Sequence, residues 1–421
     1  MRFITTVLLA CLWASVSSAR DEFQKGLDAY NKQDYTTAME YWRPLVEQEN
    51  TTAQYNLGTM YANGQGVARD EAQAVAWYRK AAEQGVAAAQ FNLGVMYDSG
   101  RGVARDEARA MSWYRKAAEQ GVAAAQLNLG VGYAIGRGIV KNETQAVTWF
   151  RKAAEQGHAD AQFNLGVMYD NGQGIARDET QAVTWFRKAA EQGHADAQFS
   201  LGDMYENGHG IARDEAQAVI WFRKAADQQL AEAQLKLGEM YASGRGVSKN
   251  EAQALAWYQK AAEQQNATAQ FKLGEIYENG NGVIKDEAQA ATWFRKAAQL
   301  QHPDAQFKLG EMYAHGDSMK QDYARAVYWQ ALPARQGNEQ ASKNLAIYRD
   351  HLNKYRVRVN LLNIRTKPTI DSTVVKQAQQ GDILYQLSEP NDGWIKIYLP
   401  NEHTTGYVSE PLVERLDNDG Q

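Results

Sequence analysis

The sequence is short of cysteine, and that shortage removes several kinds of chemistry. Its 421 residues contain one cysteine, Cys11, which falls inside the N-terminal leader described below. If the leader is removed, the mature chain has no thiol. Disulfides, zinc sites with cysteine ligands and cysteine nucleophiles are then all excluded.

The sequence also lacks an excess of basic charge, a long apolar run and any recognisable catalytic motif. Lysine and arginine number 45 against 50 aspartates and glutamates, and the two signs are interspersed, which argues against nucleic-acid binding. Beyond the leader, no apolar run approaches about 18 residues, so we expect the mature chain not to span a membrane. There is no Ser-x-x-Lys, Gly-x-Ser-x-Gly, phosphate loop or zinc motif. We therefore expect no enzyme activity, no cofactor and no metal.

The first 19 residues have the features of a secretory signal peptide. A Met-Arg start is followed by an apolar stretch from Phe3 to Val16 and then by Ser17-Ser18-Ala19. This predicts cleavage after Ala19 and a periplasmic or secreted protein. The stretch Leu8-Leu9-Ala10-Cys11 matches a bacterial lipobox, so lipidation of Cys11 is an alternative. It would leave a leader of only ten residues with hardly any apolar core, which favours plain removal.

What the sequence has in abundance is repetition. A leucine returns every 36 residues, each time followed by glycine except at the last position, at Leu57, Leu93, Leu129, Leu165, Leu201, Leu237, Leu273, Leu309 and Leu345. A tryptophan returns at the same interval, at Trp77, Trp113, Trp149, Trp185, Trp221, Trp257, Trp293 and Trp329. A fixed period of this length indicates stacked copies of one supersecondary unit, none of which buries its apolar face alone. We therefore predict a solenoid, with the tryptophans in its core.

Each copy predicts a pair of helices, as the residues from Ala87 to Gln120 illustrate. Apolar residues in the first half are spaced i, i+4, i+7 and i+8, which places them on one helix face, and Gly94 leaves room for a neighbouring helix. Gly100 is expected to end the first helix. Asp106 is expected to cap the second, and the glutamine found three residues after this aspartate in most copies indicates a capping box. Trp113 and Tyr114 are both expected on the buried stripe of that second helix, so the unit is a helical hairpin.

The repeated pattern Ala-x-Ala-Gln-Phe-x-Leu-Gly-x-Met-Tyr-x-x-Gly-x-Gly, followed by Ala-x-x-Trp-[Tyr/Phe]-x-Lys-Ala-Ala, resembles the Sel-one-like repeat family. That family is related to tetratricopeptide repeats, and the resemblance implies a mostly α fold, an α/α superhelical solenoid of helix-turn-helix repeats. The predicted segments are a signal peptide at 1–19, a divergent N-terminal capping repeat at 20–56, repeats at 57–337 and a C-terminal capping helix at 338–355. Pro333 is expected to weaken or kink the helix that contains it.

After residue 355 the pattern changes to short β-branched or aromatic runs separated by Pro, Gly, Asn and Asp, which predicts strands. Leu362-Asn363-Ile364-Arg365, Gly381-Asp382, Gly393-Trp394-Ile395 and Gly406-Tyr407-Val408 resemble the bacterial SH3-like domain. We expect a small all-β barrel at 356–416, followed by a polar tail at 417–421. Such domains usually accompany envelope or cell-wall proteins, which implies a bacterial source.

Two columns on the first helix change along the array. The residue before the repeat leucine is Asn56, Asn92, Asn128 and Asn164, then Ser200, Lys236, Lys272 and Lys308. Two residues after the leucine, the series is Thr59, Val95, Val131 and Val167, then Asp203, Glu239, Glu275 and Glu311. In the resembling families this helix lines a concave groove, which implies that the asparagines and lysines contact an extended peptide. The alternative is that Lys236/Glu239, Lys272/Glu275 and Lys308/Glu311 are solvated i,i+3 ion pairs.

Two further sets of side chains invite functional interpretations. Trp394, Tyr398 and Tyr407 could form an aromatic groove on the barrel for a peptide or for peptidoglycan, although a small barrel also needs aromatic residues in its core. His158, His194 and His302 share one repeat position, but no acidic residue or cysteine accompanies them at metal-ligand spacing. We interpret these histidines as solvated helix starts.

The sequence therefore predicts an exported, non-enzymatic bacterial scaffold that binds protein or peptide partners along its solenoid and envelope material through its barrel. One alternative is a secreted factor that acts on host proteins. Another is a β-lactam-binding or β-lactam-hydrolysing enzyme, because some cysteine-rich members of the repeat family are described so. Those members have paired cysteines in each repeat, and this chain has none. A eukaryotic luminal adaptor fits the solenoid but not the bacterial-type barrel.

Overall fold

The computed structural model describes residues 20–416. The predicted signal peptide with Cys11, and the tail at 417–421, lie outside the described residues. The chain divides into two compact units between Arg213 and Asp214, and each unit is described by itself.

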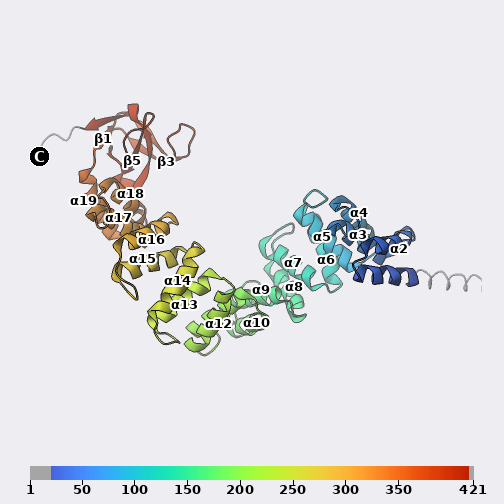
Figure 1. The fold of residues 1–421 in the computed structure, drawn as a ribbon. Coiled ribbons are helices and arrows are strands. Elements are labelled where there is room, and N and C mark those ends of the chain that lie inside the picture. The colour runs from blue at the N-terminus through green and yellow to red at the C-terminus, as the bar shows by residue number, and fades with distance from the viewer. Residues whose placement is uncertain (1–19, 417–421) are drawn as a thin grey trace, which may run out of the picture. The chain divides into compact units, whose positions relative to one another are not determined.

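The first unit is a stack of helical hairpins, visible in blue to green in Figure 1. Residues 20–31 are helical and precede α2 (Tyr35–Glu47). The first helices of the repeats are α3 (Thr51–Asn63), α5 (Ala87–Ser99), α7 (Ala123–Ile135), α9 (Ala159–Asn171) and α11 (Ala195–Asn207). The second helices are α4 (Glu71–Glu83), α6 (Glu107–Glu119), α8 (Glu143–Glu155) and α10 (Glu179–Glu191). From α2 to α11, each helix packs on the next one in the chain.

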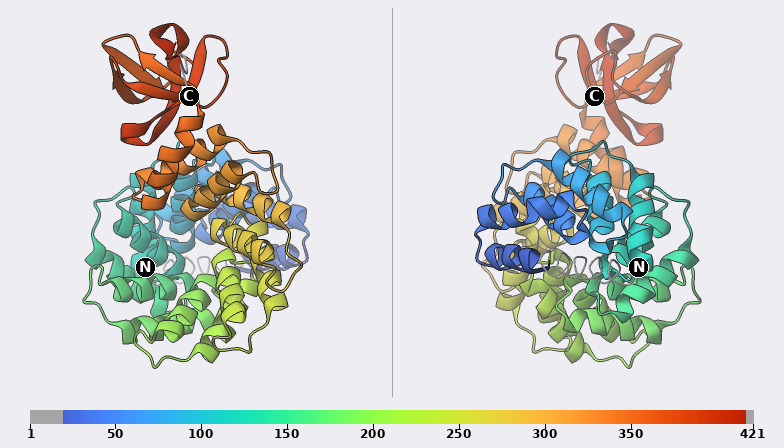
Figure 2. Two further views of the ribbon diagram at one scale, coloured as in Figure 1. Left: turned by 90° about the vertical axis from the view of Figure 1, so that its left-hand side faces the viewer. Right: turned by 90° about the vertical axis from the view of Figure 1, so that its right-hand side faces the viewer.

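The second unit continues the hairpins and ends in a sheet (Figures 1 and 2). Its helices are α12 (Glu215–Asp227), α13 (Ala231–Ser243), α14 (Glu251–Glu263), α15 (Ala267–Asn279), α16 (Glu287–Gln299), α17 (Pro303–His315), α18 (Tyr323–Arg335) and α19 (Glu339–Tyr348). Pro333 lies inside α18, which continues to Arg335. The helix therefore accommodates this proline in its last turn. The predicted solenoid of helix pairs is confirmed.

The helix ends follow from local chemistry. Gly100 has a φ of 71° and ends α5, because glycine adopts the left-handed conformation without a steric cost. The Asp106 side chain accepts a hydrogen bond of 2.9 Å from the Arg109 amide and caps α6. The predicted capping box is only half right. The backbone N–H of Asp106 donates to the Tyr97 carbonyl at 3.0 Å, so this donor is already satisfied without a side chain from the third position.

A buried ladder of glutamines, which the sequence analysis did not interpret, joins successive repeats. Gln90 is 5% exposed, and its side-chain amide donates to the carbonyl of Ala82, at the end of the preceding second helix, at 3.0 Å. Its Oε1 accepts from the Gln120 amide at 2.8 Å. Gln126 and Gln162 make the same two contacts one and two repeats later. Because buried polar groups are costly without partners, this ladder fixes how neighbouring repeats pack.

The core consists of the alanine and leucine columns together with the aromatic residue that follows each of the first seven repeat tryptophans. Tyr114, Phe222 and Phe294 are 0 to 1% exposed. The prediction of a tryptophan core is only partly right, because Trp149 and Trp257 are buried at 8% exposure whereas the other six are half-buried. Lysine ammonium groups lie over the rings of the first seven tryptophans, Trp77 to Trp293, at 3.8 to 4.2 Å from the ring centroid. The tryptophans thus lie at the margin of the core as cation–π partners.

The C-terminal part of the described residues is an antiparallel seven-stranded sheet in the order β3-β2-β6-β5-β4-β1-β7. Its strands are β1 (Lys354–Val357), β2 (Leu361–Arg365), β3 (Val374–Gln379), β4 (Ile383–Gln386), β5 (Trp394–Leu399), β6 (Thr404–Ser409) and β7 (Val413–Leu416). Alternate residues such as Leu362, Ile364, Ile395 and Ile397 are buried and form its core. The predicted SH3-like fold is confirmed.

The sheet packs against the last helices of the second unit, as the orange and red segments of Figure 2 show. α18 contacts β5 and β6. Tyr385 and Tyr398 share one core with Tyr348 and Leu352, beyond the end of the repeats. Among the helices in the described residues, none is both long and apolar enough to cross a bilayer.

Candidate binding surface of the repeats

Pockets occur between successive repeats, on the side of the first helices that carries the variable columns. The first-unit pocket has a volume of about 250 Å³ and is lined by Thr59, Glu71, Tyr78, Asn92, Val95 and Arg101, among others. The second-unit pocket has a volume of about 520 Å³ and is lined by Glu239, Glu251, Tyr258, Lys272, Glu275 and Asn281, among others. Each residue of the first set lies 180 positions, or five repeats, before its counterpart in the second. The same hollow is therefore lined by different chemistry in the two units.

The first-unit pocket is neutral at its floor. Its aromatic residue, Tyr78, is buried, and the phenol hydroxyl donates to Thr59 Oγ1 at 3.2 Å. Burial is the main reason that the pKa of Tyr78 is raised, and hydrogen bonding to Thr59 and Asn92 opposes that rise. Asn92 thus lines the pocket and also lies within hydrogen-bonding reach of its floor. Its amide can offer both a donor and an acceptor to a peptide backbone.

The other asparagines hold the same place on their helices and are likewise half-buried. Asn128 lies within hydrogen-bonding reach of Tyr114, which repeats the arrangement of Asn92 and Tyr78. Asn164 differs, because the residue in phase with Tyr78 is Phe150, which has no hydroxyl. Within residues 20–416, the Asn164 side chain has no hydrogen-bond partner. Its amide groups are therefore available to a ligand.

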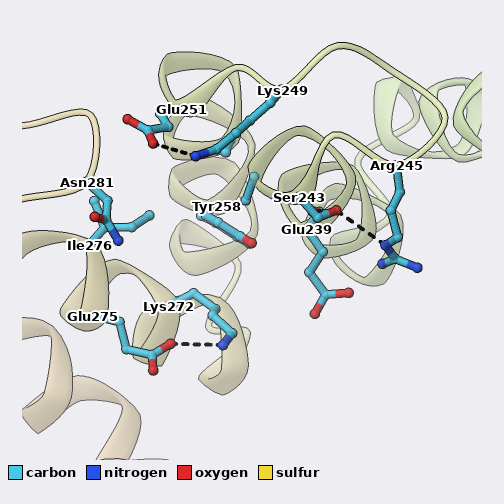
Figure 3. A pocket seen from close by; sticks show the side chains of 12 residues that line it. Glu239, Ser243, Arg245, Lys249, Glu251, Tyr258, Lys272, Glu275, Ile276 and Asn281 are labelled. Atoms are coloured by element: carbon cyan, nitrogen blue, oxygen red, sulfur yellow. Dashed lines mark hydrogen bonds and ion pairs between the residues drawn. The ribbon is translucent and has the colours of Figure 1, made fainter. Parts of the chain in front are cut away.

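Ion pairs surround the second-unit pocket (Figure 3). Lys272 pairs with Glu275 at 2.8 Å on one helix, as the i,i+3 alternative predicted. Lys308 instead reaches back to Glu278 of the preceding repeat at 3.3 Å. Lys236 occupies the same position on α13 and is half-buried. The lysine column therefore takes part in salt bridges both within a repeat and between repeats.

The sequence analysis missed the floor of these pockets. The aromatic residue after each tryptophan was assigned only to the core, yet Tyr78 and Tyr258 also line the pockets. The available signal was the alternation of this column between tyrosine and phenylalanine, since a buried tyrosine needs a hydrogen-bond partner that phenylalanine does not need. Thr59 is such a partner, and it lies on the other helix of the hairpin.

The three histidines begin helices, but they are half-buried rather than solvated. His194 and His302 each stack on a phenylalanine, Phe163 and Phe271, with ring centroids 4.7 Å apart. Each also caps its helix, because its Nδ1 accepts a hydrogen bond from the amide three residues later. No group of three or more side chains that could hold a metal occurs in the part of the chain that the structure describes.

We predict a pH-dependent loss of stability from His302. Burial is the main cause that lowers its pKa from the ordinary value of 6.5; Lys272 also lowers it, and Asp304 and Glu275 oppose the shift. Because the unfolded chain then takes up the proton first, stability is full above pH 6.5 and falls as the pH drops from there through the folded pKa. Protonated Nδ1 cannot accept the capping bond, which is worth roughly 1 kcal/mol.

Urea unfolding as a function of pH tests this prediction, with His302→Asn as the matched variant. Asn266 holds the same position one repeat earlier and caps its helix through Oδ1 at 2.9 Å, so asparagine preserves the cap without a titrating group. As the pH falls below 6.5, the free energy of unfolding should decrease more for the wild type than for His302→Asn. Parallel curves for the two proteins would contradict the assignment.

The aromatic groove predicted on the barrel does not form as expected. Tyr398 is 0% exposed; its hydroxyl is hydrogen-bonded to His403 Nδ1 at 2.8 Å, and it belongs to the core shared with the last helices. The assignment of Tyr398 to an open groove is therefore wrong, because the end of the solenoid covers this part of the sheet. Trp394 and Tyr407 remain half-exposed. Lys396 follows Trp394 by two residues on β5 and is paired with Tyr407 of β6. Its ammonium group lies over the Tyr328 ring of α18, 3.9 Å from the ring centroid.

Comparison with known families agrees with this architecture. The Sel1 repeat model matches eight consecutive stretches, 51–86, 87–122, 123–158, 159–194, 195–230, 231–266, 267–302 and 303–338. The bacterial SH3 domain model matches residues 360–414. None of the curated proteins matches the chain.

Two solved structures resemble the chain over most of its length. One is a protective antigen present in uropathogenic Escherichia coli strains, which displays an SLR fold; it is 34% identical, with 82% of this chain and 91% of that chain covered and a TM-score of 0.51. The other is a Sel1 repeat protein from Oxalobacter formigenes, 33% identical, with 73% and 89% covered and a TM-score of 0.60.

Proposed function

The chain belongs to the Sel1 repeat family and carries a C-terminal bacterial SH3 domain, and from this premise we propose that it is an exported scaffold that binds extended protein segments along its inter-repeat pockets. Both modules are protein-interaction modules, and Sel1-repeat proteins are generally non-catalytic scaffolds. Repeat arrays use such extended surfaces for recognition, because each repeat adds a copy of the same surface.

The observation that carries this proposal is the recurrence of the pocket in phase. The predicted contact residues Asn92 and Lys272 each line such a pocket, at equivalent positions five repeats apart. Asn128 and Asn164 continue the amide column in the same unit and can hydrogen-bond a peptide backbone.

We predict that alanine at Asn92, Asn128 and Asn164 together weakens partner capture without unfolding the protein. Each side chain is half-buried at the same position of its first helix, where Asn92 lines the first-unit pocket, so its loss removes backbone hydrogen bonds to the partner and leaves the core intact. At about 1 kcal/mol for each hydrogen bond, the triple change should reduce affinity roughly a hundredfold.

Pull-down from the producing cells, read by mass spectrometry, measures this loss. The matched control replaces Thr148, Thr184 and Ser112 by alanine, because these exposed side chains lie on second helices of the same unit, away from the pockets. Wild type and control should recover the same partners, and the asparagine variant should lose them. Identical recovery by all three proteins would show that the asparagine column does not bind.

The proposal includes export and an envelope role for the barrel. The N-terminal leader with cleavage after Ala19 supports export, and the similar E. coli protein is described as a protective antigen, which is consistent with an exposed protein. Trp394 and Tyr407 are the barrel side chains left open to peptide or peptidoglycan. Fractionation of the producing cells, and sedimentation of the mature chain with purified peptidoglycan, test these two parts separately. A cytosolic protein, or no co-sedimentation, would remove the corresponding part.

A further inference from the structure

The tyrosine hydroxyl at the pocket floor is hydrogen-bonded in the first unit but not in the second. There, the Tyr78 hydroxyl donates to Thr59. In the second-unit pocket the tyrosine is kept as Tyr258, but Glu239 stands in place of Thr59 and Lys272 in place of Asn92. The substitution changes the pocket floor from a closed neutral pair to a phenol beside carboxylates.

The cations around the pocket are engaged with other groups. Lys249 pairs with Glu251 at 3.0 Å and Lys272 with Glu275 at 2.8 Å. Arg245 lies at the rim, where its Nε donates to the Ser243 hydroxyl at 3.3 Å. These contacts leave Glu239 as a carboxylate that forms no ion pair with any residue from 20 to 416. Glu239 is therefore a carboxylate of the pocket wall without a salt-bridge partner in this range, in a pocket that Arg245 also lines.

Tyr258 provides a second, independent sign of a ligand. Its side chain is 3% exposed, and its hydroxyl has no hydrogen-bond partner among the described residues, although buried tyrosines usually have one. Figure 3 shows the phenol oxygen directed into the pocket, toward the space between Glu239 and Lys272. Burial, then Glu239 and Glu275, raise the pKa of Tyr258 above its ordinary value of 10. Arg245 opposes this shift, but burial and the two carboxylates outweigh it and the hydroxyl stays protonated.

We propose that this pocket binds a basic side chain, an arginine or lysine of a partner segment, between the Glu239 carboxylate and the Tyr258 hydroxyl. Ala242, Ala254 and Ile276 supply apolar walls for the aliphatic stem of such a side chain. The cationic head then gives Glu239 a charge-assisted hydrogen bond and the phenol oxygen a donor. The proposal rests on the proposed function, and it adds the chemistry that one pocket selects.

The first-unit pocket should not select the same side chain. Thr59 and Val95 offer no charge, and the Tyr78 hydroxyl is already occupied. The two units therefore bind different parts of a partner: the first pocket through hydrogen bonds between neutral groups, and the second by accepting a cationic side chain of the partner. This difference gives the experiment an internal comparison.

A titration with a minimal probe tests the pocket directly. The full mature protein is isotope-labelled in its tyrosine rings for NMR. It is titrated with Nα-acetyl-arginine amide and, separately, with Nα-acetyl-citrulline amide, which has the same shape but no charge. The loss of a signal in Tyr258→Phe identifies the Tyr258 resonance in the NMR spectrum. The variant Glu239→Gln removes the charge from the pocket, and Glu232→Gln removes one from an exposed site on the same helix.

The arginine probe should shift the Tyr258 signal in a saturable way, and the citrulline probe should not. Glu239→Gln should weaken the arginine probe roughly tenfold, as expected for the loss of a charge-assisted bond, and Glu232→Gln should leave it unchanged. Equal shifts with citrulline, an unchanged affinity in Glu239→Gln, or an equal loss in Glu232→Gln would each overturn the assignment.

Pull-down with Glu239→Gln separates this inference from the proposed function. Partners captured equally by wild type and Glu239→Gln, together with no arginine-specific shift, would overturn the basic-side-chain pocket and leave the scaffold function standing. An arginine-specific shift at Tyr258 in a protein that captures no partner would overturn the scaffold function and support the pocket. Loss of partners in Glu239→Gln supports both.

Discussion

Replacing Phe294 by alanine is expected to lower the free energy of unfolding by about 3 to 5 kcal/mol. The ring is 0% exposed and lies in the core of the second unit. It occupies the space that Gly274 leaves open on the facing first helix, where a Cβ atom would overlap it. Alanine would leave a cavity there that the surrounding helices cannot fill by small movements. Urea unfolding followed by circular dichroism measures the loss.

Trp293→Ala is the matched control for this prediction, because Trp293 precedes Phe294 and is the larger side chain. Its ring is only half-buried and carries the Lys296 ammonium at 3.9 Å. We expect it to cost roughly 1 to 2 kcal/mol, less than half the cost of Phe294→Ala. A larger loss for Trp293→Ala than for Phe294→Ala would show that the tryptophan, and not the phenylalanine, fills the core.

Gly102→Ala should destabilise the protein by about 2 to 5 kcal/mol, from two causes that add. Gly102 has a φ of 66°, a conformation that costs an alanine energy. A Cβ atom at this position would also overlap the Glu71 carbonyl at the start of the preceding second helix. To avoid this overlap, the loop would have to move away from the preceding repeat. The glycine recurs in every earlier and later loop up to Gly282, and Ser318 takes its place in the last one with a φ of 57°.

Gly85→Ala isolates the first of these causes. Gly85 has a φ of 92°, but nothing lies within 4 Å of a Cβ atom built there. Gln229 and Gln265 occupy the same repeat position with positive φ, so the array tolerates a side chain at this turn. We expect a cost of about 1 to 2 kcal/mol. Equal losses for Gly85→Ala and Gly102→Ala would mean that the close approach of the loop to the preceding repeat contributes nothing.

The repeat architecture follows from the period, but the identity of the core aromatic residue does not. Neighbouring residues on a helix point about 100° apart, so when Phe294 packs against the facing first helix, Trp293 lies at the margin of the core. The sequence pattern places both residues on the buried stripe of the second helix and does not rank them. The decisive information is the facing glycine, such as Gly94, where a Cβ atom would lie 2.7 Å from the Tyr114 ring. That contact joins two helices, and helical periodicity within one helix does not contain it.

The same limit applies to the candidate site. Asn92 and Lys272 could be placed at a variable surface of the first helix, because their columns lie beside the leucine stripe. The pocket floor could not be placed, because the bond between Tyr78 and Thr59 joins residues on two helices. In the barrel, strand alternation places Trp394 and Tyr398 on one face. Which part of that face α18 covers depends on how the barrel packs, and Tyr398 is buried for that reason.

Site-specific photo-crosslinking in the producing cells tests the central claim most directly. A benzoyl-phenylalanine is placed at Asn164, which is in phase with the pocket residue Asn92, or at Thr148, which is exposed on α8. If partners bind along the inter-repeat pockets, position 164 captures them and position 148 does not. Capture from 148 alone, or equal capture from both, would contradict binding through this surface.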